Sequence, residues 1–316
     1  MSLVQSTHLS SSLLIDPFLP LFLTPHLHTT PGSHSHWLYL KSYHSWDAFD
    51  DQYIGCEEEM DRRAPDLLKK EKSNSSLFST AWENSRKKWQ SVKTKISLYL
   101  PPDFTDEHGR AIVTYTDKEF SRMLNQAVRE NGKSQADYMD NFYFKAFHYY
   151  LTRGLRLLNG SCDVTYKMEV FRGVSGIRFK HKGPGLMRFG QFTSSSLKKE
   201  VAEKFGTDSF FTIRTCFGRD IRAFSHSPEE DEVLIPFNEK FSVFKGKGNN
   251  SFVLRSTNRT CSYFNCAYLG GEYRAGQEKH LSGVFAGVNL KRERELRRET
   301  LTCGGLGVIS CQTSCC

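Results

Sequence analysis

The sequence has no uninterrupted apolar run long enough to cross a membrane. Its longest apolar stretch, Leu13 to Leu23, is broken by one aspartate and two prolines, whereas a membrane-spanning helix needs about 20 consecutive apolar residues. No Lys or Arg precedes Lys41, so the charged region that begins a secretory signal peptide is also missing. We therefore expect residues 1–45 to form an atypical, disordered N-terminal segment.

Several widespread catalytic signatures are also missing. The chain contains no strand–Gly-x-Gly-x-x-Gly–helix pattern, no Walker A sequence, no His-Glu-x-x-His and no Gly-x-Ser-x-Gly elbow. These absences argue against a Rossmann dehydrogenase, a P-loop enzyme, a zinc protease and an α/β-hydrolase. Gly246 and Gly248 are followed by Asn-Asn-Ser rather than by a helical pattern, and they predict a turn.

Metal-ligand spacing is absent as well, although cysteine is plentiful. The nine cysteines form no Cys-x-x-Cys pair, and no histidine stands at zinc-ligand spacing from any of them, so we expect no thiolate metal site. Disulfides formed in an oxidising compartment fit this cysteine content better. Four Asn-x-Ser/Thr sequons, at Asn74, Asn159, Asn249 and Asn258, agree with a secreted glycoprotein.

Basic residues are not concentrated in any one part of the sequence. The chain has 43 Lys and Arg against 35 Asp and Glu, a net charge of +8 at pH 7, but the basic residues are spread out. This balance permits an anionic small ligand and predicts no nucleic-acid partner. With 24 Phe and 13 Tyr among 316 residues, the chain can bury a sizeable core in one large domain or two modest ones.

Helical periodicity dominates the first half of the chain. Thr116 and Glu119 form a capping-box pattern, and the apolar residues after them recur every three or four positions until Gly132, which predicts an amphipathic helix. Helical patterns also occupy two further segments, 81–96 and about 137–158, and residues 57–76 are expected to be an irregular or helical surface segment.

The period changes after Gly160. Apolar and polar residues alternate from Val164 to Val170, which predicts a strand. Further short strands are expected at 209–215, 221–224, 232–237, 241–245, 251–255 and 263–269. Helices that precede strands predict an α+β fold with an antiparallel or mixed sheet, rather than alternating βαβ units.

Two segments in the strand-rich half carry groups suited to ligand binding. Arg172 stands at the end of a predicted strand, where its planar guanidinium can hold a phosphate, and Gly173 lets a ligand approach the backbone. Ser194 begins a serine triplet whose hydroxyls can orient a carboxylate or a ribose. Taken singly, each has an ordinary explanation: a solvated arginine at a strand end, or a serine-rich turn that caps the helix predicted near Leu197.

An acidic segment runs directly into an apolar strand pattern at Glu230, Asp231 and Glu232. Because strand side chains alternate, Glu230 and Glu232 are expected to share one face, roughly 7 Å apart, while Asp231 points away. Most acidic clusters are solvated faces. Two carboxylates that repel each other at one place also suit a site that stabilises a developing positive charge.

Taken in order, these segments resemble the R-S-E class of mono-ADP-ribosyltransferases, and most closely the vertebrate ecto-enzymes that modify arginine. The resemblance covers about Phe49 to Val288. It rests on five segments: Asp50–Cys56, Ala111–Thr116, Phe171–Gly173, Arg188–Leu197 and Glu230–Pro236. It implies an α+β fold, with N-terminal helices packed on a β-sandwich core of two roughly perpendicular sheets. The catalytic domain would span 46–290, followed by a charged, Cys-rich tail at 291–316.

The same resemblance implies two disulfides. Cys56 would pair with Cys266, and Cys162 with Cys216. Cys261 and the four tail cysteines have no counterpart that the resemblance assigns. Relatives often carry a glycolipid anchor, which requires a hydrophobic C-terminal tail of ~10–20 residues. Residues 300–316 lack such a tail, so we expect a secreted soluble form.

The resemblance also implies that NAD+ is a co-substrate and that no separate cofactor or metal takes part. Arg172 would hold the phosphates, Ser194 would brace the catalytic carboxylate, and Glu232 would hydrogen-bond the nicotinamide ribose. Further NAD+ contacts are expected from the backbone of Gly173 and from three side chains, Tyr115, Gln191 and Ser225.

The implied reaction is transfer of ADP-ribose from NAD+ to arginine side chains of target proteins, with release of nicotinamide. Glu230 would bind the acceptor guanidinium and help to remove its proton, and the turn at 224–229 would help to receive the acceptor. In the family, Glu at this first acidic position accompanies arginine specificity. Two alternatives stay open: an NAD glycohydrolase with little transfer, and a secreted domain that has lost activity.

Overall fold

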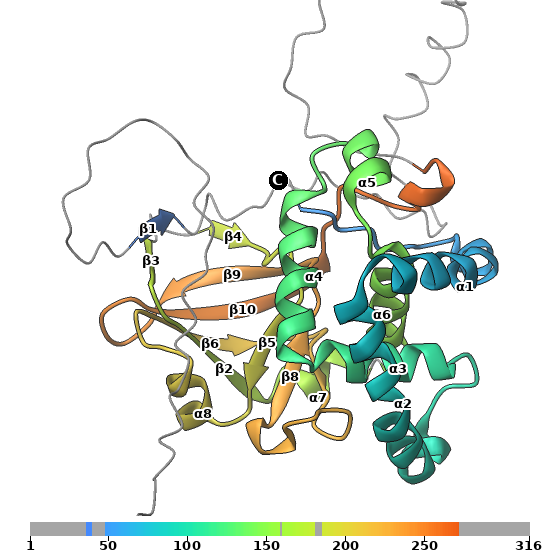
Figure 1. Cartoon of the computed structure of the whole chain (residues 1–316). Helices are drawn as coiled ribbons and strands as arrows, with labels where there is room; N and C mark the ends of the chain where they lie inside the picture. Colours follow the sequence, from blue (N-terminus) through green and yellow to red (C-terminus); the bar gives the residue numbers. More distant parts are fainter. Residues whose placement is uncertain (1–35, 40–47, 159, 181–184, 272–316) are drawn as a thin grey trace, which may run out of the picture.

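The computed structural model describes residues 36–39, 48–158, 160–180 and 185–271 (Figure 1). Apart from the short strand β1 (His36–Tyr39), the expectations for residues 1–45 and 291–316 lie outside these ranges. Among the residues that the structure describes, no helix combines the length and the apolar character that crossing a membrane requires.

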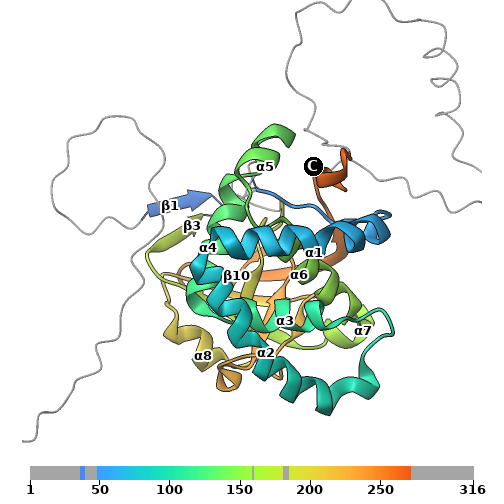
Figure 2. The same cartoon turned by 45° about the vertical axis from the view of Figure 1, so that its right-hand side comes forward.

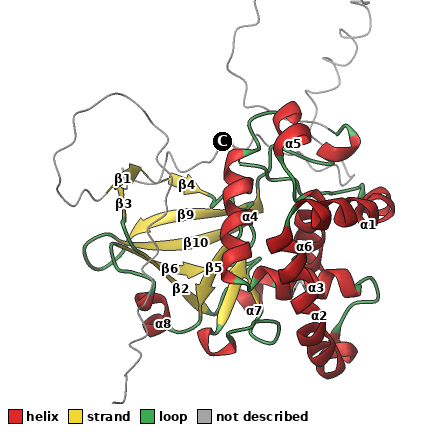
Figure 3. Ribbon diagram, in the orientation of Figure 1, coloured by secondary structure: helices red, strands yellow, loops and turns green. Residues whose placement is uncertain are grey.

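Helices precede most of the strands, as the periodicity predicted, and they gather beside the sheet (Figure 3). Segment 57–76 is helical, and the 81–96 helix begins five residues earlier than predicted. The helices are α1 (Glu57–Asn74), α2 (Ser76–Ile96), α3 (Asp106–Tyr115), α4 (Lys118–Glu130), α5 (Gln135–Asn141), α6 (Lys145–Leu157), α7 (Cys162–Thr165) and α8 (Lys199–Lys204), with 3-10 turns η2 (Ser97–Tyr99), η3 (Pro228–Glu230) and η4 (Ala267–Leu269).

Two helix predictions are corrected. Helix α4 is capped by Asp117, whose carboxylate accepts hydrogen bonds from the N–H groups of Glu119 and Phe120, so the expected capping box at Thr116 is wrong. The single helix over 137–158 is also wrong, because the chain leaves helical geometry between α5 and α6. Phe142 and Phe144 are buried there among other aromatic rings, and aromatic residues are only moderate helix formers.

The strands are β2 (Glu169–Val174), β3 (Ile177–Lys180), β4 (Gly185–Met187), β5 (Thr193–Ser196), β6 (Ser209–Arg214), β7 (Arg219–Asp220), β8 (Glu232–Ile235), β9 (Glu239–Lys245) and β10 (Ser251–Thr260). The strand expected from Val164 begins only at Glu169, because Ser161 caps the short helix α7 instead. Residues 221–224 form a turn, and 263–269 bend into η4. Both strand predictions there are wrong.

In the described ranges, eight strands form one hydrogen-bonded sheet in the order β4-β9-β10-β6-β2-β5-β8-β7, and β1 pairs with β3. Strands β10 and β6 are parallel and the other pairs in the large sheet are antiparallel. Strands β2 and β5 meet at a single residue pair, Phe171 and Ser196. On either side of this pair the sheet changes direction, and β8 runs across β9 and β10 (Figure 1). The mixed sheet therefore has two crossed halves, and the α+β prediction is confirmed.

Buried side chains form two apolar clusters. One lies between the helices and the β5–β8 half of the sheet, and Phe49 stacks on Tyr138 there at 4.1 Å between ring centroids. The other lies on the β6, β9 and β10 half. Helices α1, α2, α3 and α6 stand together on one side, and α4 lies against the sheet (Figure 2). Helix α4 thus stands at the junction of helices and strands, where the cavity described below is found.

The two predicted disulfides are present. Cys56 bonds Cys266 with a Cα–Cα distance of 6.1 Å, and Cys162 bonds Cys216 with a Cα–Cα distance of 4.4 Å. The first connects the start of α1 to the start of η4, 210 residues later. The N-terminal helical segment is therefore tied to the end of the described strand region.

Candidate active site

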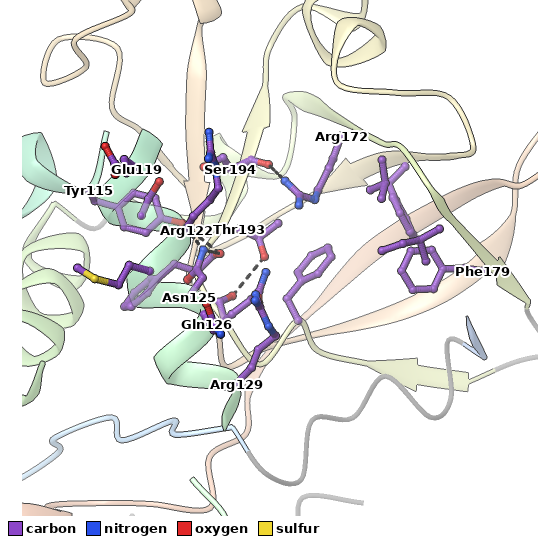
Figure 4. A pocket seen from close by; sticks show the side chains of 18 of the residues that line it. Tyr115, Glu119, Arg122, Asn125, Gln126, Arg129, Arg172, Phe179, Thr193 and Ser194 are labelled. Atoms are coloured by element: carbon purple, nitrogen blue, oxygen red, sulfur yellow. Dashed lines mark hydrogen bonds between the residues drawn. The ribbon is translucent and has the colours of Figure 1, made fainter. Parts of the chain in front are cut away.

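A cavity of about 600 Å³ lies between α4 and the strands β2, β3 and β5 (Figure 4). Helix α4 supplies its polar side chains along one wall, and the strands supply the opposite wall. The lining residues that matter below are Glu119, Arg122, Asn125, Gln126 and Arg129 from α4, and Arg172, Phe179, Gln191 and Ser194 from the strand side. The cavity thus joins segments that are far apart in the sequence.

Three guanidinium groups face this cavity, from Arg122, Arg129 and Arg172. The Nη1 of Arg172 donates to the carbonyl of Ser194 at 2.7 Å, and the Nη1 of Arg129 donates to the Oε1 of Gln191 at 2.6 Å. Arg172 lies within β2, paired with Phe211 of β6, so its expected place at a strand end is wrong. Planar guanidinium groups held in this way suit phosphate oxygens.

The far end of the cavity is apolar. Its lining there consists of Ile177, Phe179, Met187, Phe189 and Phe211. Phe211 packs edge-on against Phe179, with ring centroids 5.4 Å apart. A wall of aromatic and aliphatic side chains beside cationic groups suits a ligand with both a flat ring and an anionic part.

Tyr115 closes the cavity near Ser194. Its hydroxyl donates to the carbonyl of Phe192 at 3.2 Å and accepts from the Nδ2 of Asn125 at 3.0 Å. Burial raises the pKa of Tyr115 to about 12, so the phenol stays neutral at physiological pH. Tyr115, one of the side chains predicted to contact NAD+, thus lines this cavity.

Glu232 is the buried carboxyl group next to this end of the cavity. It begins β8 and pairs with Ser196 of β5, while Ser194 pairs with Leu234, so Ser194 and Glu232 lie on one face of the two strands. Burial raises the pKa of Glu232, and the nearby charge of Glu230 raises it too. A hydrogen bond from Ser194 and the charges of Lys118 and Arg172 act in the opposite direction.

Glu230 reaches the same place by a different route from the predicted one. It lies in the turn η3, outside β8, and Asp231 between the two glutamates has a left-handed backbone with φ 46° and ψ 50°. The prediction that strand alternation places both carboxylates on one face is therefore wrong, because Glu230 lies before the strand and a left-handed residue separates it from Glu232. Glu230 forms an ion pair with Lys118, with 2.6 Å between Nζ and Oε1.

Three other predicted groups have structural contacts. A Cβ at Gly173 would meet the carbonyl oxygens of Ala202 and Gly206 at 2.2 Å, so close packing of α8 requires glycine there. The hydroxyl of Ser225 accepts from the N–H of Ser227 at 3.0 Å and lies outside the residues that line the cavity. Phe224 is buried and stacks on Trp89, so only the later part of the 224–229 turn is exposed to an acceptor.

Sequence reasoning did not identify the α4 wall of the cavity. It used the apolar face of this helix and assigned no role to Arg122, Gln126 and Arg129. These three residues have a spacing of four and three, which places them on one helical face. A basic and polar stripe opposite an apolar one was the available signal. Among the described residues, no group of three or more His, Cys, Asp or Glu could hold a metal ion.

Comparison with known proteins identifies relatives that are similar in sequence and in fold. The family model described as NAD:arginine ADP-ribosyltransferase matches residues 45–262. Ecto-ADP-ribosyltransferase 5 of Rattus norvegicus is 48% identical over 238 residues, 73% of this chain and 77% of the relative. T-cell ecto-ADP-ribosyltransferase 1 of the same species is 43% identical over 227 residues, 70% of this chain and 78% of the relative.

Solved structures agree. A mutant of the eukaryotic mono-ADP-ribosyltransferase ART2.2 in complex with NADH is 39% identical, with a TM-score of 0.63 over 73% of this chain and 99% of that one. A second mutant of ART2.2, in complex with NAD, is 40% identical, with a TM-score of 0.62 over 71% of this chain and 97% of that one. By its sequence and its fold, this chain belongs to the NAD:arginine ADP-ribosyltransferase family.

Proposed function

We propose that this protein transfers ADP-ribose from NAD+ to arginine side chains of protein acceptors and releases nicotinamide. The observation that carries the proposal is the position of Glu232. This buried carboxyl group lies beside the Ser194 hydroxyl and the charges of Arg172 and Glu230, and Ser194 and Arg172 both line the cavity. Family membership supports the same reaction.

NAD+ fits the chemistry of the cavity. The pyrophosphate would lie against Arg172 and the neighbouring arginines of α4, because guanidinium groups bind phosphate oxygens in a bidentate manner. The apolar end around Phe179 and Phe211 suits a flat heterocycle. The nicotinamide ribose would then lie near Tyr115 and Ser194, close to Glu232. We keep Gly173, Gln191 and Ser225 as proposed NAD+ contacts, although the structure gives each of them a structural partner as well.

The first chemical step breaks the bond between C1′ of ribose and the nicotinamide nitrogen. Nicotinamide leaves with the bonding electron pair, and the ribose acquires oxocarbenium character. A carboxylate held beside the ribose stabilises this charge most in the transition state, as in glycoside hydrolysis. Glu232 would have this role once ionised, with Ser194 and Arg172 holding its charged form.

The second step forms a bond between C1′ and a guanidinium nitrogen of the acceptor. A protonated guanidinium is a poor nucleophile, so it must be oriented and must lose a proton. Glu230 is partly exposed, with 24% of its side chain accessible, and it lies close enough to Glu232 to raise its pKa. Its carboxylate would bind the acceptor and accept the proton.

The experiment measures two products from NAD+ labelled in its adenylate group. Labelled agmatine, a small guanidine acceptor, reports transfer, and free ADP-ribose reports hydrolysis. The variant Glu232→Gln should lower both rates by about 100- to 1000-fold, as loss of one electrostatic stabiliser does in other enzymes. Glu203→Gln removes an exposed carboxylate from α8, outside the residues that line the cavity, and should keep near wild-type rates.

The two products also separate the alternatives. Free ADP-ribose with no labelled agmatine or protein would identify an NAD glycohydrolase. Absence of both products from folded protein would overturn the proposal and leave an interaction domain without activity. Equal activity of wild type and Glu232→Gln would overturn the role of Glu232 alone.

We further propose that the protein works outside the cell. Two disulfides are present in the described ranges, and such bonds persist in oxidising compartments. The sequons at Asn74, Asn249 and Asn258 lie on exposed residues, where glycans can be attached. Relatives carry the prefix ecto in their names. Mass spectrometry of protein secreted from animal cells would test both the glycans and the termini.

A further inference from the structure

Asp231, between the two glutamates of the proposed site, has an unusual backbone. Its φ of 46° and ψ of 50° place it in the left-handed region, which is uncommon for residues other than glycine, although Asp and Asn tolerate it best. Its N–H donates to the carbonyl of Pro228 and ends the turn η3, and β8 begins at the next residue. The relative orientation of Glu230 and Glu232 is therefore set by a turn at Asp231.

Two cations hold the side chain of Asp231. The Nζ of Lys198 lies 2.5 Å from its Oδ2, and the Nη1 of Arg222 lies 3.1 Å from its Oδ1. Arg222 is fixed in turn by Asp220, with 2.6 Å between Nη2 and Oδ2. Lys198 and Arg222 hold the pKa of Asp231 below its ordinary value, so the carboxylate is ionised at neutral pH and keeps both contacts.

The backbone around Asp231 is held from the same direction. The hydroxyl of Ser196 donates to the carbonyl of Glu230 at 2.7 Å, and the N–H of Leu197 donates to the carbonyl of Asp231 at 3.0 Å. The last residue of β5, Ser196, and the two residues after it, Leu197 and Lys198, thus all contact the acidic segment 230–232. A left-handed residue persists where its surroundings over-determine it, commonly at functional sites.

We propose that Asp231 is a positioning residue that places the Glu230 carboxylate for the acceptor, and so controls whether ADP-ribose passes to arginine or to water. The inference rests on the proposed function. Glu232 is fixed independently by its pairing with Ser196 and by the N–H of Ile221, which donates to its carbonyl at 3.0 Å. Loss of the Asp231 contacts should therefore displace Glu230 much more than Glu232.

The test compares transfer to agmatine with hydrolysis of NAD+ in Asp231→Asn and Asp231→Ala. Asn tolerates the left-handed backbone but loses the charge, whereas Ala loses both properties. Asp231→Ala should lower kcat/KM for agmatine by about 10- to 100-fold, the scale expected when a group is misplaced by about 1 Å. Hydrolysis should fall less than about threefold, because Glu232 keeps its place. Asp231→Asn should lie between wild type and Asp231→Ala.

Further variants control for folding and for charge. The double variant Lys198→Gln with Arg222→Gln removes the same contacts from two half-exposed side chains and should reproduce the Asp231→Asn result. If Asp231→Ala does not fold, this double variant and Asp231→Asn decide. Lys199→Gln removes the charge next to Lys198 but no contact of Asp231, because Lys199 pairs with Glu203, and it should stay within about twofold of wild type, since exposed ion pairs contribute little.

The results distinguish this inference from the proposed function. If wild type transfers ADP-ribose and the Asp231 variants keep its ratio of transfer to hydrolysis, the positioning role is overturned and the function stands. A parallel loss of both rates in folded Asp231→Asn would also overturn it. If wild type neither transfers ADP-ribose nor hydrolyses NAD+, the proposed function is overturned, and the inference about Asp231 is overturned with it.

Discussion

Two regions of the molecule bury carboxyl groups, and the partners of these carboxyl groups differ between the two regions. In the N-terminal anchor, Asp50 pairs with the buried Arg188 at 2.6 Å and accepts hydrogen bonds from the N–H groups of Tyr263 and Phe264. In the proposed active site, the side chain of Glu232 meets the Ser194 hydroxyl and the repelling charge of Glu230. In this anchor, made of Asp50, Asp51 and the backbone of residues 263–267, backbone N–H groups and a guanidinium surround the carboxylates, whereas the active site places the like charge of Glu230 beside Glu232.

Asp51 makes the anchor stronger still. It accepts from the N–H groups of Tyr53, Cys266 and Ala267, next to the Cys56–Cys266 disulfide. Such pairing holds the 263–267 segment against the start of the helical region. A buried carboxylate that accepts several hydrogen bonds stabilises the fold. A buried carboxylate next to a like charge and a cavity is a candidate for contact with a substrate. The same residue type thus has two roles, decided by its partners.

The largest expected effect breaks the anchor. Asp50→Asn leaves the Arg188 guanidinium buried without its counter-charge, and removal of one partner of a buried pair costs about 3–5 kcal/mol. The free energy of unfolding, measured by urea denaturation, should fall by that amount. Glu232→Gln is the matched control, because no ion pair joins Glu232 to a cation among the residues that the structure describes, and its stability should change by less than about 1 kcal/mol. Equal losses in both variants would contradict the comparison.

A further buried carboxyl group, that of Glu71, gives a pH-dependent test of intermediate size. Glu71 accepts from the N–H groups of Ala146 and Phe147 at 2.6 and 3.1 Å, at the start of α6. Burial nevertheless raises its pKa from 4.5 to about 8. The native state therefore binds more protons than the unfolded state between these values, so stability contributed by Glu71 is complete below about pH 4.5 and is lost as pH rises through 8.

Urea denaturation between pH 6.5 and 8 measures this effect. Wild type should lose up to about 1.4 kcal/mol per pH unit through Glu71, and Glu71→Gln should flatten the slope. Burial lowers the pKa of His108 to about 4 and of His148 to about 3, so these rings bind protons near pH 6.5 only in the unfolded state and oppose the Glu71 slope. Both proteins carry the same histidines, so this contribution cancels when their slopes are compared. Identical slopes in the two proteins would show that Glu71 is ionised when folded.

Local signals predicted part of this molecule and long-range contacts decided the rest. Short apolar segments between turn residues predicted β6, β8 and β9, and the order of the motifs led to the proposed site residues Arg172, Ser194 and Glu232. Nothing local to Asp50 indicates that it binds backbone groups 213 residues later. Alternation also failed at Glu230, because a single left-handed residue, Asp231, replaces the pleat there. Both misses concern geometry imposed by partners from other elements.

The smallest expected effect concerns the ion pair between the Glu230 carboxylate and Lys118. The ammonium of Lys118 lies 2.6 Å from this carboxylate, where an acceptor guanidinium would have to bind. Lys118 is exposed over 58% of its side chain, so the pair is weak enough to be displaced. Removal of this competitor in Lys118→Gln should lower the KM for agmatine by about 1.4- to fivefold, the equivalent of an exposed ion pair of about 0.2–1 kcal/mol.

A second readout follows from the charge of Lys118, which lowers the pKa of Glu232. Its removal should move the acidic limb of kcat/KM to higher pH, because Glu232 must be ionised to act. Lys199→Gln is the matched control: Lys199 forms an exposed ion pair with Glu203 at 3.3 Å on α8, and its loss should change neither quantity. An unchanged or higher KM in Lys118→Gln would mean that Lys118 does not compete with the acceptor guanidinium for the Glu230 carboxylate.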